Sequence, residues 1–407
     1  MSEWREITIK NAAQTKGLIG GPFGSKLVSR DYVETGVPVI RGQNLGSGRW
    51  VDLTDSVFVS ESKMERDLAS NLAEPGDLIY TQRGTLGQVA IMPSDAPSCV
   101  ISQSQMRLRV DPSIADPKFV FYWSTSPYFR KAIADHAIVA GVPHINLGIL
   151  GSLPLLLPPI SVQQSVARVL GSIDDLIENN RRRIEVLEEM ARSIYREWFV
   201  KFRYPGHENV PLVDSELGPI PEGWAVTRLE ESATFVSGGT KTKAAYADTG
   251  FVAFSAAGPD GFLSDFEIDG PGVVLSAVGA RCGKTFWASG KWSSIANTIK
   301  IIPKDSSLTA AWLRFTTEDT NIWPKRGSAQ PFVSISDARG VKSVRADHET
   351  HRRFEEVAMT MIDEAGALRD MMRSLIGLRD TLLPKLVTGQ IDVSSLDLDT
   401  LIAEQVV

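Results

Sequence analysis

Two long stretches of the chain place apolar residues three and four positions apart, which is the spacing of an amphipathic helix. In the first stretch this pattern starts at Val166, and an additional step of four beside Asn180 predicts a stutter in a heptad repeat. Adding 188 to each number reproduces the pattern in the second stretch, where Leu368 corresponds to Asn180 and where Glu364 and Arg379 are polar exceptions. The predicted core positions are Val166, Val169, Ile173, Leu176, Ile184, Leu187, Ile194 and Trp198 in the first helix, and Phe354, Val357, Met361, Leu368, Met372, Leu375, Leu382 and Leu386 in the second.

The two helices are expected to pair with each other. About 35 residues at 1.5 Å each make a rod of roughly 50 Å, and a lone rod would leave its apolar stripe in water. Because each helix follows a globular stretch, the simplest pairing is antiparallel, with Asn180 as a polar residue that sets the register. The alternative, in which each helix is an ordinary core helix of its own domain, stays open.

The globular stretches are also repeated. Each begins with short runs of Val, Ile, Phe and Tyr that are broken by Gly, Pro and Asp turns, and each contains a short helical segment, near residues 117–134 and 308–319. Several motifs recur in the same order: residues 20–26 are echoed by 237–241, residues 36–40 by 250–254, residues 75–80 by 271–275, and residues 141–146 by 329–334.

Together these patterns predict an α+β chain. Two similar α/β modules are separated by a pair of long antiparallel coiled-coil helices, with a pseudo-two-fold internal repeat. The predicted boundaries are residues 1–157 for the first module, 158–204 for the first long helix, 205–222 for a linker, 223–346 for the second module, 347–388 for the second long helix and 389–407 for a C-terminal tail.

Composition favours a globular protein of the reducing cytoplasm. The chain is 43% hydrophobic and 23% charged, has only two cysteines, and contains no apolar run long enough for a membrane span. Its net charge of −6 counts against a nucleic-acid binder. The acidic surplus lies in the helices and the tail, however, whereas the two modules carry 0 and +3. Local lysine and arginine therefore remain available for phosphate contacts.

The layout resembles the specificity (S) subunit of type I restriction–modification enzymes. The residues that carry the resemblance are LPPISVQQ at 157–164, ARSIYREWF at 191–199, ELGPIPEGW at 216–224 and LRDTLLPKLVTG at 378–389. The corresponding entry to the second helix, VRADHETH at 344–351, lacks the double proline and the double glutamine.

The resemblance implies that each module reads one half of a bipartite sequence in double-stranded DNA. It further implies that the helices fix the gap and dock two methyltransferase subunits, which use S-adenosylmethionine to methylate adenine N6. A motor–nuclease subunit, where present, would use ATP and Mg²⁺. No catalytic residue, cofactor or metal is expected in this chain.

Candidate base-reading residues are Arg, Lys, Asn, Gln and His in turn-rich segments, because these side chains match the polar edges of bases. The pairs Gln82–Arg83 and Lys325–Arg326 are the first choices. The full set is Lys26, Arg30, Arg41, Gln43, Asn44, Gln82, Arg83, Gln103, Gln105, His144 and Asn146 in the first module, and Lys241, Lys243, Arg281, Lys284, Asn297, Lys325, Arg326 and Gln330 in the second.

Two other classes of function stay open. A coiled-coil interaction scaffold without a DNA role would suit the acidic charge. A nucleotide-dependent enzyme would use the run Gly279 to Thr285, which resembles a phosphate-binding loop but has Val278 where that loop needs glycine. A turn that presents Arg281 and Lys284 to DNA is the favoured interpretation of this run.

Overall fold

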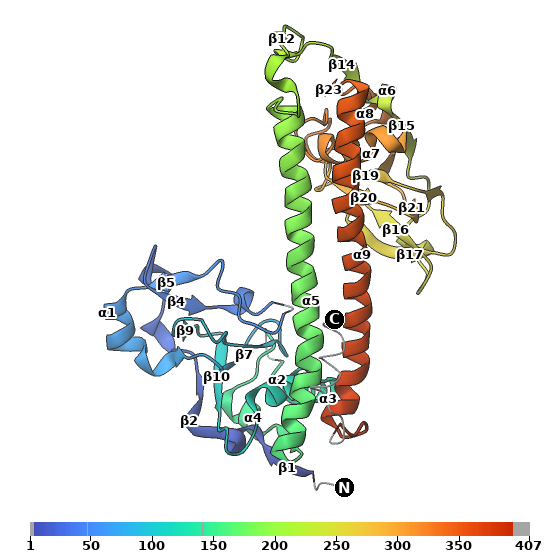
Figure 1. Cartoon of the computed structure of the whole chain (residues 1–407). Coiled ribbons are helices and arrows are strands. Elements are labelled where there is room, and N and C mark those ends of the chain that lie inside the picture. The colour runs from blue at the N-terminus through green and yellow to red at the C-terminus, as the bar shows by residue number, and fades with distance from the viewer. Residues whose placement is uncertain (1–3, 47, 140–141, 394–407) are drawn as a thin grey trace. The chain divides into compact units, whose positions relative to one another are not determined.

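The computed structural model describes residues 4–46, 48–139 and 142–393 (Figure 1). The chain forms two compact units, one of residues 1–181 with 370–407 and one of residues 182–369. Each unit contains one globular module together with part of each long helix. Residues 394–407 of the predicted tail and Gly141 of the repeated motif lie outside the described residues.

The module of the first unit is built on two sheets. One has the order β2 (Ala13–Gly20), β10 (Gln105–Val110), β7 (Leu78–Thr81) and β8 (Val89–Ile91), and the other has the order β3 (Tyr32–Val33), β5 (Val57–Val59), β4 (Val37–Ile40), β9 (Cys99–Ile101) and β6 (Leu72–Ala73). A two-stranded sheet and four short helices complete it: β1 (Arg5–Thr8) with β11 (Pro154–Leu157), and α1 (Glu61–Lys63), α2 (Pro117–Thr125), α3 (Pro127–His136) and α4 (Leu147–Ser152).

The module of the second unit repeats this topology except for the edge strand β3, which has no counterpart among the described residues. Its first sheet has the order β15 (Ala233–Ser237), β22 (Thr298–Pro303), β19 (Gly272–Ser276) and β20 (Thr285–Ala288), and its second has the order β17 (Gly258–Leu263), β16 (Phe251–Ser255), β21 (Lys291–Ser294) and β18 (Ile268–Asp269). The remaining elements are β12 (Leu212–Val213) with β13 (Ile220–Pro221), β14 (Ala225–Arg228) with β23 (Lys342–Arg345), α6 (Leu229–Ser232), α7 (Ser306–Thr316) and α8 (Ile335–Arg339).

The repeat extends to the unusual strand pairing. In each module the second sheet is mostly antiparallel but contains one parallel pair, β4 with β9 in the first and β16 with β21 in the second. The predicted segment 117–134 differs from its echo, because it forms two helices rather than one. Ser126 ends α2 and starts α3, since its hydroxyl accepts the backbone N–H of Phe129 and Pro127 occupies the first turn.

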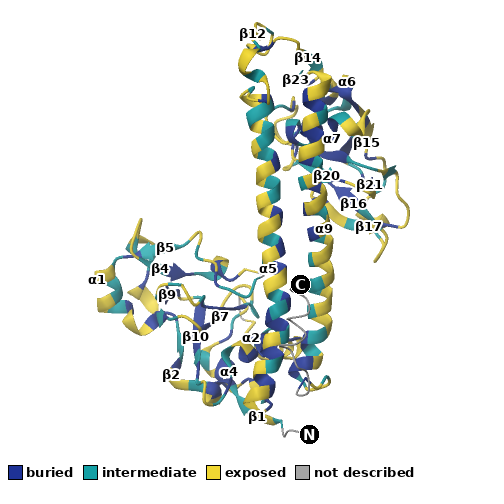
Figure 2. Ribbon diagram, viewed as in Figure 1, coloured by how far each residue is buried: buried dark blue, intermediate teal, exposed yellow. Residues whose placement is uncertain are grey.

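The long helices are α5 (Ile160–Tyr195) and α9 (His348–Val387), and buried and exposed positions alternate along both (Figure 2). The predicted stutter is wrong. Leu176 is 46% exposed and Val357 is 40% exposed, whereas the next residues, Ile177 and Ala358, are buried. A shift of one residue turns a side chain by about 100° around the helix, away from the core.

With that correction the buried and half-buried positions form one regular heptad whose steps alternate between four and three. Glu364 is no longer an exception, because the neighbouring Ala365 takes the core position. The ladder is Val166, Leu170, Ile173, Ile177, Asn180, Ile184, Leu187, Ala191, Ile194 and Trp198, and its counterparts 188 residues later are Phe354, Ala358, Met361, Ala365, Leu368, Met372, Leu375, Arg379, Leu382 and Leu386.

Contacts within the second unit give the direction of pairing. Arg183 of α5 forms a 2.8 Å ion pair with Glu364 of α9, and the ring of Tyr195 lies 6.1 Å from the ring of Phe354. As residue numbers rise along α5 they fall along α9, so the two helices run antiparallel. In the first unit Arg379 of α9 contacts Asp174 of α5 at 3.1 Å.

Candidate nucleic-acid interface

Loops at one end of the first module are tied together by backbone hydrogen bonds. Gly21 N donates to Gln105 O at 2.9 Å, Gln82 N donates to Ser104 O at 2.7 Å, and Ile145 N donates to Gln82 O at 3.0 Å. We call these segments the first loop cluster, which comprises residues 20–27, 81–88, 102–105 and 142–146.

The second module contains the same three bonds. Gly238 N donates to Thr298 O, Ala277 N donates to Asn297 O, and Val333 N donates to Ala277 O, each at 2.9 Å. The second loop cluster comprises residues 237–242, 276–284, 294–298 and 325–333. The sequence echoes therefore mark loops that have the same backbone connections.

One glycine at the same place in each cluster is needed for this close approach. A Cβ on Gly21 would lie 1.9 Å from the carbonyl oxygen of Ser102, and a Cβ on Gly238 would lie 2.2 Å from that of Ile295. Any larger residue would push the loops apart.

Three of the candidate cations of the first module reach solvent. Lys26, Arg30 and Arg83 are exposed, and Arg83 forms an isolated β-bridge with the half-buried His144. The first choice, Gln82–Arg83, therefore lies on an accessible turn beside a second candidate. Gln82 itself and Arg41 are half-buried.

Two candidates of the first module are buried and cannot read bases in this conformation. Asn44 is 2% exposed, and its amide both donates to Asp52 O at 2.7 Å and accepts from Arg41 N at 2.8 Å. Gln105 is fully buried, and its side-chain oxygen accepts from the hydroxyl of Ser102. The prediction failed because these amide side chains are buried and form hydrogen bonds inside the module.

Three further amides are exposed but already hold loops. Gln103 donates to the carbonyl oxygens of Gly24 and Leu27 at 2.7 and 3.0 Å. Asn146 caps α4, where it accepts from Ile149 N at 2.9 Å. Gln43 donates to Asp55 O at 3.1 Å. These side chains therefore shape the loops around the exposed cations.

Most candidate cations of the second module are occupied by internal partners. Lys241 pairs with Asp265 at 3.0 Å, Lys243 with Asp260 at 2.6 Å, and Arg326 with Asp337 at 2.5 Å. The guanidinium of Arg281 donates to Ala257 O at 2.7 Å. The exposed candidates Lys284, Asn297, Lys325 and Gln330 complete the set. A phosphate would have to displace carboxylates from three of these cations.

The phosphate-loop alternative loses its structural basis. The glycines of the run, Gly279 and Gly283, adopt left-handed conformations with φ of 95° and 92°. The chain then continues as strand β20 and not as a helix. A phosphate loop depends on the N–H groups of a following helix, which are missing here.

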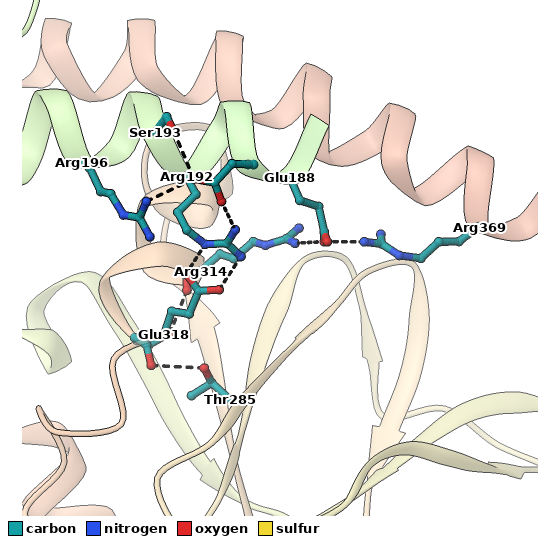
Figure 3. Close-up of polar contacts among 10 residues, drawn as sticks. Glu188, Arg192, Ser193, Arg196, Thr285, Arg314, Glu318 and Arg369 are labelled. Atoms are coloured by element: carbon teal, nitrogen blue, oxygen red, sulfur yellow. Dashed lines mark hydrogen bonds and ion pairs between the residues drawn. The ribbon is translucent and has the colours of Figure 1, made fainter. Parts of the chain in front are cut away.

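Ion pairs fix the second module to the helices (Figure 3). The carboxylate of Glu188 on α5 accepts from Arg314 of α7 at 2.5 Å and from Arg369 of α9. Nearby, Arg192 of α5 pairs with Glu318 at 2.8 Å. Burial lowers the pKa of Arg314, and hydrogen bonds to Glu318 and Glu189 raise the pKa of Arg192.

The first module has a different anchor at its helices. The Tyr122 hydroxyl donates to Asp174 at 2.7 Å, and Arg379 contacts the other oxygen of that carboxylate at 3.1 Å. Arg49 donates to Gly171 O at 3.3 Å and pairs with Asp175. Burial raises the pKa of Tyr122. Only Arg379 was signalled in the sequence, as a charge in an apolar stripe.

Within residues 4–46, 48–139 and 142–393, no helix is both long enough and apolar enough to cross a membrane.

Comparisons with known proteins agree with this architecture. Residues 1–189 match the family model of the type I restriction modification DNA specificity domain. The MjaIX specificity subunit of Methanocaldococcus jannaschii is 21% identical over 97% of this chain and 95% of its own length. The HindI specificity subunit of Haemophilus influenzae is 26% identical over 50% of this chain and 42% of its own length.

A solved structure shows the same fold. The S subunit of the type I restriction–modification system from M. genitalium superposes with a TM-score of 0.65 at 16% identity, covering 95% of this chain and 96% of that one. The resemblance seen in the sequence is thereby confirmed: residues 1–189 match the specificity-domain model, and nearly the whole chain is similar to type I restriction–modification specificity subunits.

Proposed function

We propose that each loop cluster reads one half of a bipartite DNA sequence. The observation that carries the proposal is the duplication of the clusters, with the same three backbone hydrogen bonds in each module. Exposed cations such as Arg83 and Lys284 carry positive charge, which is attracted to phosphates and to the acceptor atoms on base edges. Different side chains on a common loop framework would give the two halves different sequences.

The paired helices would set the gap between the half-sites and dock two methyltransferase subunits. In this proposal the chain is not catalytic: its partners bind S-adenosylmethionine and methylate adenine N6. A motor–nuclease subunit, if the system has one, would use ATP and Mg²⁺ to restrict unmodified DNA. Similarity to type I restriction enzyme specificity subunits supports this division of labour.

Genome-wide mapping of methylated adenines, with and without the chain, tests the proposal. Methylation of one bipartite sequence should require the chain. Arg83→Ala should relax recognition of one half-site and Arg326→Ala that of the other, each by about tenfold, because one base contact contributes about 1–3 kcal/mol.

The matched controls are Arg5→Ala in β1 and Arg228→Ala in β14, which remove exposed cations from the equivalent edge strands of the two modules. Neither control should change the methylated sequence. Loss of both half-sites from a single substitution would refute the modular assignment, and methylation independent of the chain would favour a scaffold without a DNA role.

A further inference from the structure

Phe23 is an exposed aromatic residue within the first loop cluster. Its side chain is 76% exposed, although it lies next to the buried residues Gly21 and Pro22. Single exposed apolar side chains are common on protein surfaces and need no explanation by themselves. The backbone on both sides of Phe23, however, is held in a conformation that keeps this side chain exposed.

The loop is held on both sides of Phe23. Before it, Gly21 packs so tightly on Ser102 O that a Cβ would lie 1.9 Å from that atom. After it, Gly24 adopts a left-handed conformation with φ of 62°, and Gln103 donates to Gly24 O at 2.7 Å. The backbone is therefore fixed in a form that presents the phenyl ring to solvent, as a preorganised contact would require.

Exposed cations lie on the same segment as Phe23 and on a neighbouring loop of the cluster. Lys26 and Arg30 are exposed on the same segment. A Cβ at Gly20, three residues before Phe23, would lie 4.0 Å from the side-chain oxygen of Gln82, which directly precedes the exposed Arg83. An aromatic ring among basic side chains is the combination that meets a base flanked by phosphates.

The second loop cluster lacks this aromatic residue. Gly238 makes the backbone bond that corresponds to the bond of Gly21, so Thr240 takes the place of Phe23. The residue after Thr240 is Lys241, which is paired with Asp265. An apolar contact at this point of the loop is thus available to the first module and not to the second.

We propose that Phe23 makes an apolar contact with a base of the half-site that the first module reads, and so contributes to specificity there. The inference rests on the proposed function, in which this loop cluster faces DNA. A phenyl ring can pack on the methyl group of thymine or stack on an unpaired base face. Both contacts have the same chemistry, in which an apolar surface is removed from water.

The test uses the full chain assembled with the methyltransferase subunits of its own system and duplexes that carry its mapped target. Phe23→Ala should weaken binding of the cognate duplex about tenfold. In a panel of single base changes, discrimination should fall at one or two adjacent positions of one half-site. Phe23→Leu should retain part of the affinity, because it keeps apolar surface at the same place.

Tyr128→Ala is the matched control, because it removes an exposed aromatic side chain of α3 that lies outside the loop cluster, and it should leave both half-sites as they are in the unmodified chain. Replacing thymine by deoxyuridine in the affected positions separates the two contacts. If the unmodified chain binds the deoxyuridine duplex as weakly as Phe23→Ala binds the thymine duplex, Phe23 contacts the methyl group. If the unmodified chain binds the deoxyuridine duplex normally while Phe23→Ala still weakens binding, the ring stacks on a base. Unchanged thermal unfolding would show that the loss is not a loss of folding.

Binding of Phe23→Ala equal to that of the unmodified chain would overturn the inference, as would an equal loss on cognate and unrelated DNA. Arg83→Ala distinguishes this failure from failure of the proposed function. If Arg83→Ala relaxes one half-site while Phe23→Ala changes nothing, only the role of Phe23 is refuted. If neither substitution alters recognition, the DNA-facing role of the first loop cluster fails as well.

Discussion

The two modules share the strand order of their first sheet and the same loop connections, but they differ in the side chains that join them to the helices. In the first unit a carboxylate, Asp174, lies between Tyr122 and Arg379. In the second unit Glu188 lies between two arginines, Arg314 and Arg369. The repeat thus retains backbone geometry, whereas the polar contacts that hold each module have diverged.

A second difference lies at the start of each long helix. Gln163 is buried in the first unit, where it accepts from Asp116 N and donates to Pro158 O at 2.9 and 2.8 Å. Its counterpart 188 residues later is His351, which is 2% exposed and lies 5.3 Å from the ring of Trp312. His351 therefore packs among aromatic rings at the position where Gln163 makes hydrogen bonds.

One turn further along the helix, Ala167 of the first unit corresponds to Glu355 of the second. The carboxylate of Glu355 is 3% exposed and accepts from Ala311 N and Trp312 N at 2.8 and 3.0 Å. At these two positions, only the second unit carries titratable groups. The difference shows that equivalent places in a duplicated fold can respond differently to pH.

The largest expected effect comes from lengthening the two long helices, which both units share. Inserting one matched heptad in α5 and one in α9 should preserve the ladder, because its steps of four and three have no stutter. About 10 Å of added rod corresponds to about three base pairs of duplex. Methylation mapping should show both half-sites unchanged with a wider gap, and an active variant with the original gap would contradict the spacer role.

The next effect is confined to the second unit. Burial raises the pKa of Glu355 to about 7 from an ordinary value of 4.5, although its two backbone donors oppose the shift. The folded state therefore holds the proton of Glu355 more tightly than the unfolded state does, so that protonation of Glu355 stabilises the fold. This stabilisation is full below pH 4.5 and is lost as the pH rises through about 7. The size of the contribution is about 3 kcal/mol.

Denaturant titrations between pH 5 and 8, followed by hydrogen exchange of each unit, would measure this loss. Glu355→Gln should flatten the pH dependence of the second unit and leave that of the first unchanged. His351 acts in the opposite sense between about pH 4 and 6.5, because burial lowers its pKa to about 4 from 6.5. Both chains in this comparison therefore carry His351→Gln, so that only Glu355 differs. An equal slope in both units would show that the difference at these positions has no consequence.

A smaller loss is expected from the anchor of the second module. Glu188→Gln would leave Arg314 and Arg369 without their shared carboxylate and should lower the stability of the second unit by about 2 kcal/mol. Hydrogen exchange should increase in α7 and β20 and not in the first unit. The control is Glu185→Gln, an exposed position on the same helix. Equal losses from both substitutions would mean that the anchor contributes nothing specific.

The sequence predicted the repeat, the long helices and a short helical segment in each module, because periodicity and turn residues report local structure. It missed the helix register by one residue at two positions of each helix, where Val169 adjoins Leu170 and Leu176 adjoins Ile177, and where Val357 adjoins Ala358 and Glu364 adjoins Ala365. Spacing alone cannot choose between adjacent apolar residues when both satisfy a three–four pattern.

The candidate site was predicted less well, since residue type does not reveal burial or long-range partners. Asn44 and Gln105 have suitable chemistry but are buried. The pairing of Lys243 with Asp260 joins residues 17 positions apart, and that of Arg314 with Glu188 joins residues 126 apart. Such contacts depend on the tertiary fold. Phe23 was missed because the search was limited to polar side chains.

In the proposed function each module reads its own half-site. The most direct test replaces residues 223–346 with a second copy of residues 1–157 and maps the adenines that the assembled enzyme methylates. The account predicts a symmetric target made of two inverted copies of the first half-site. Methylation of the original asymmetric sequence by this variant would contradict it.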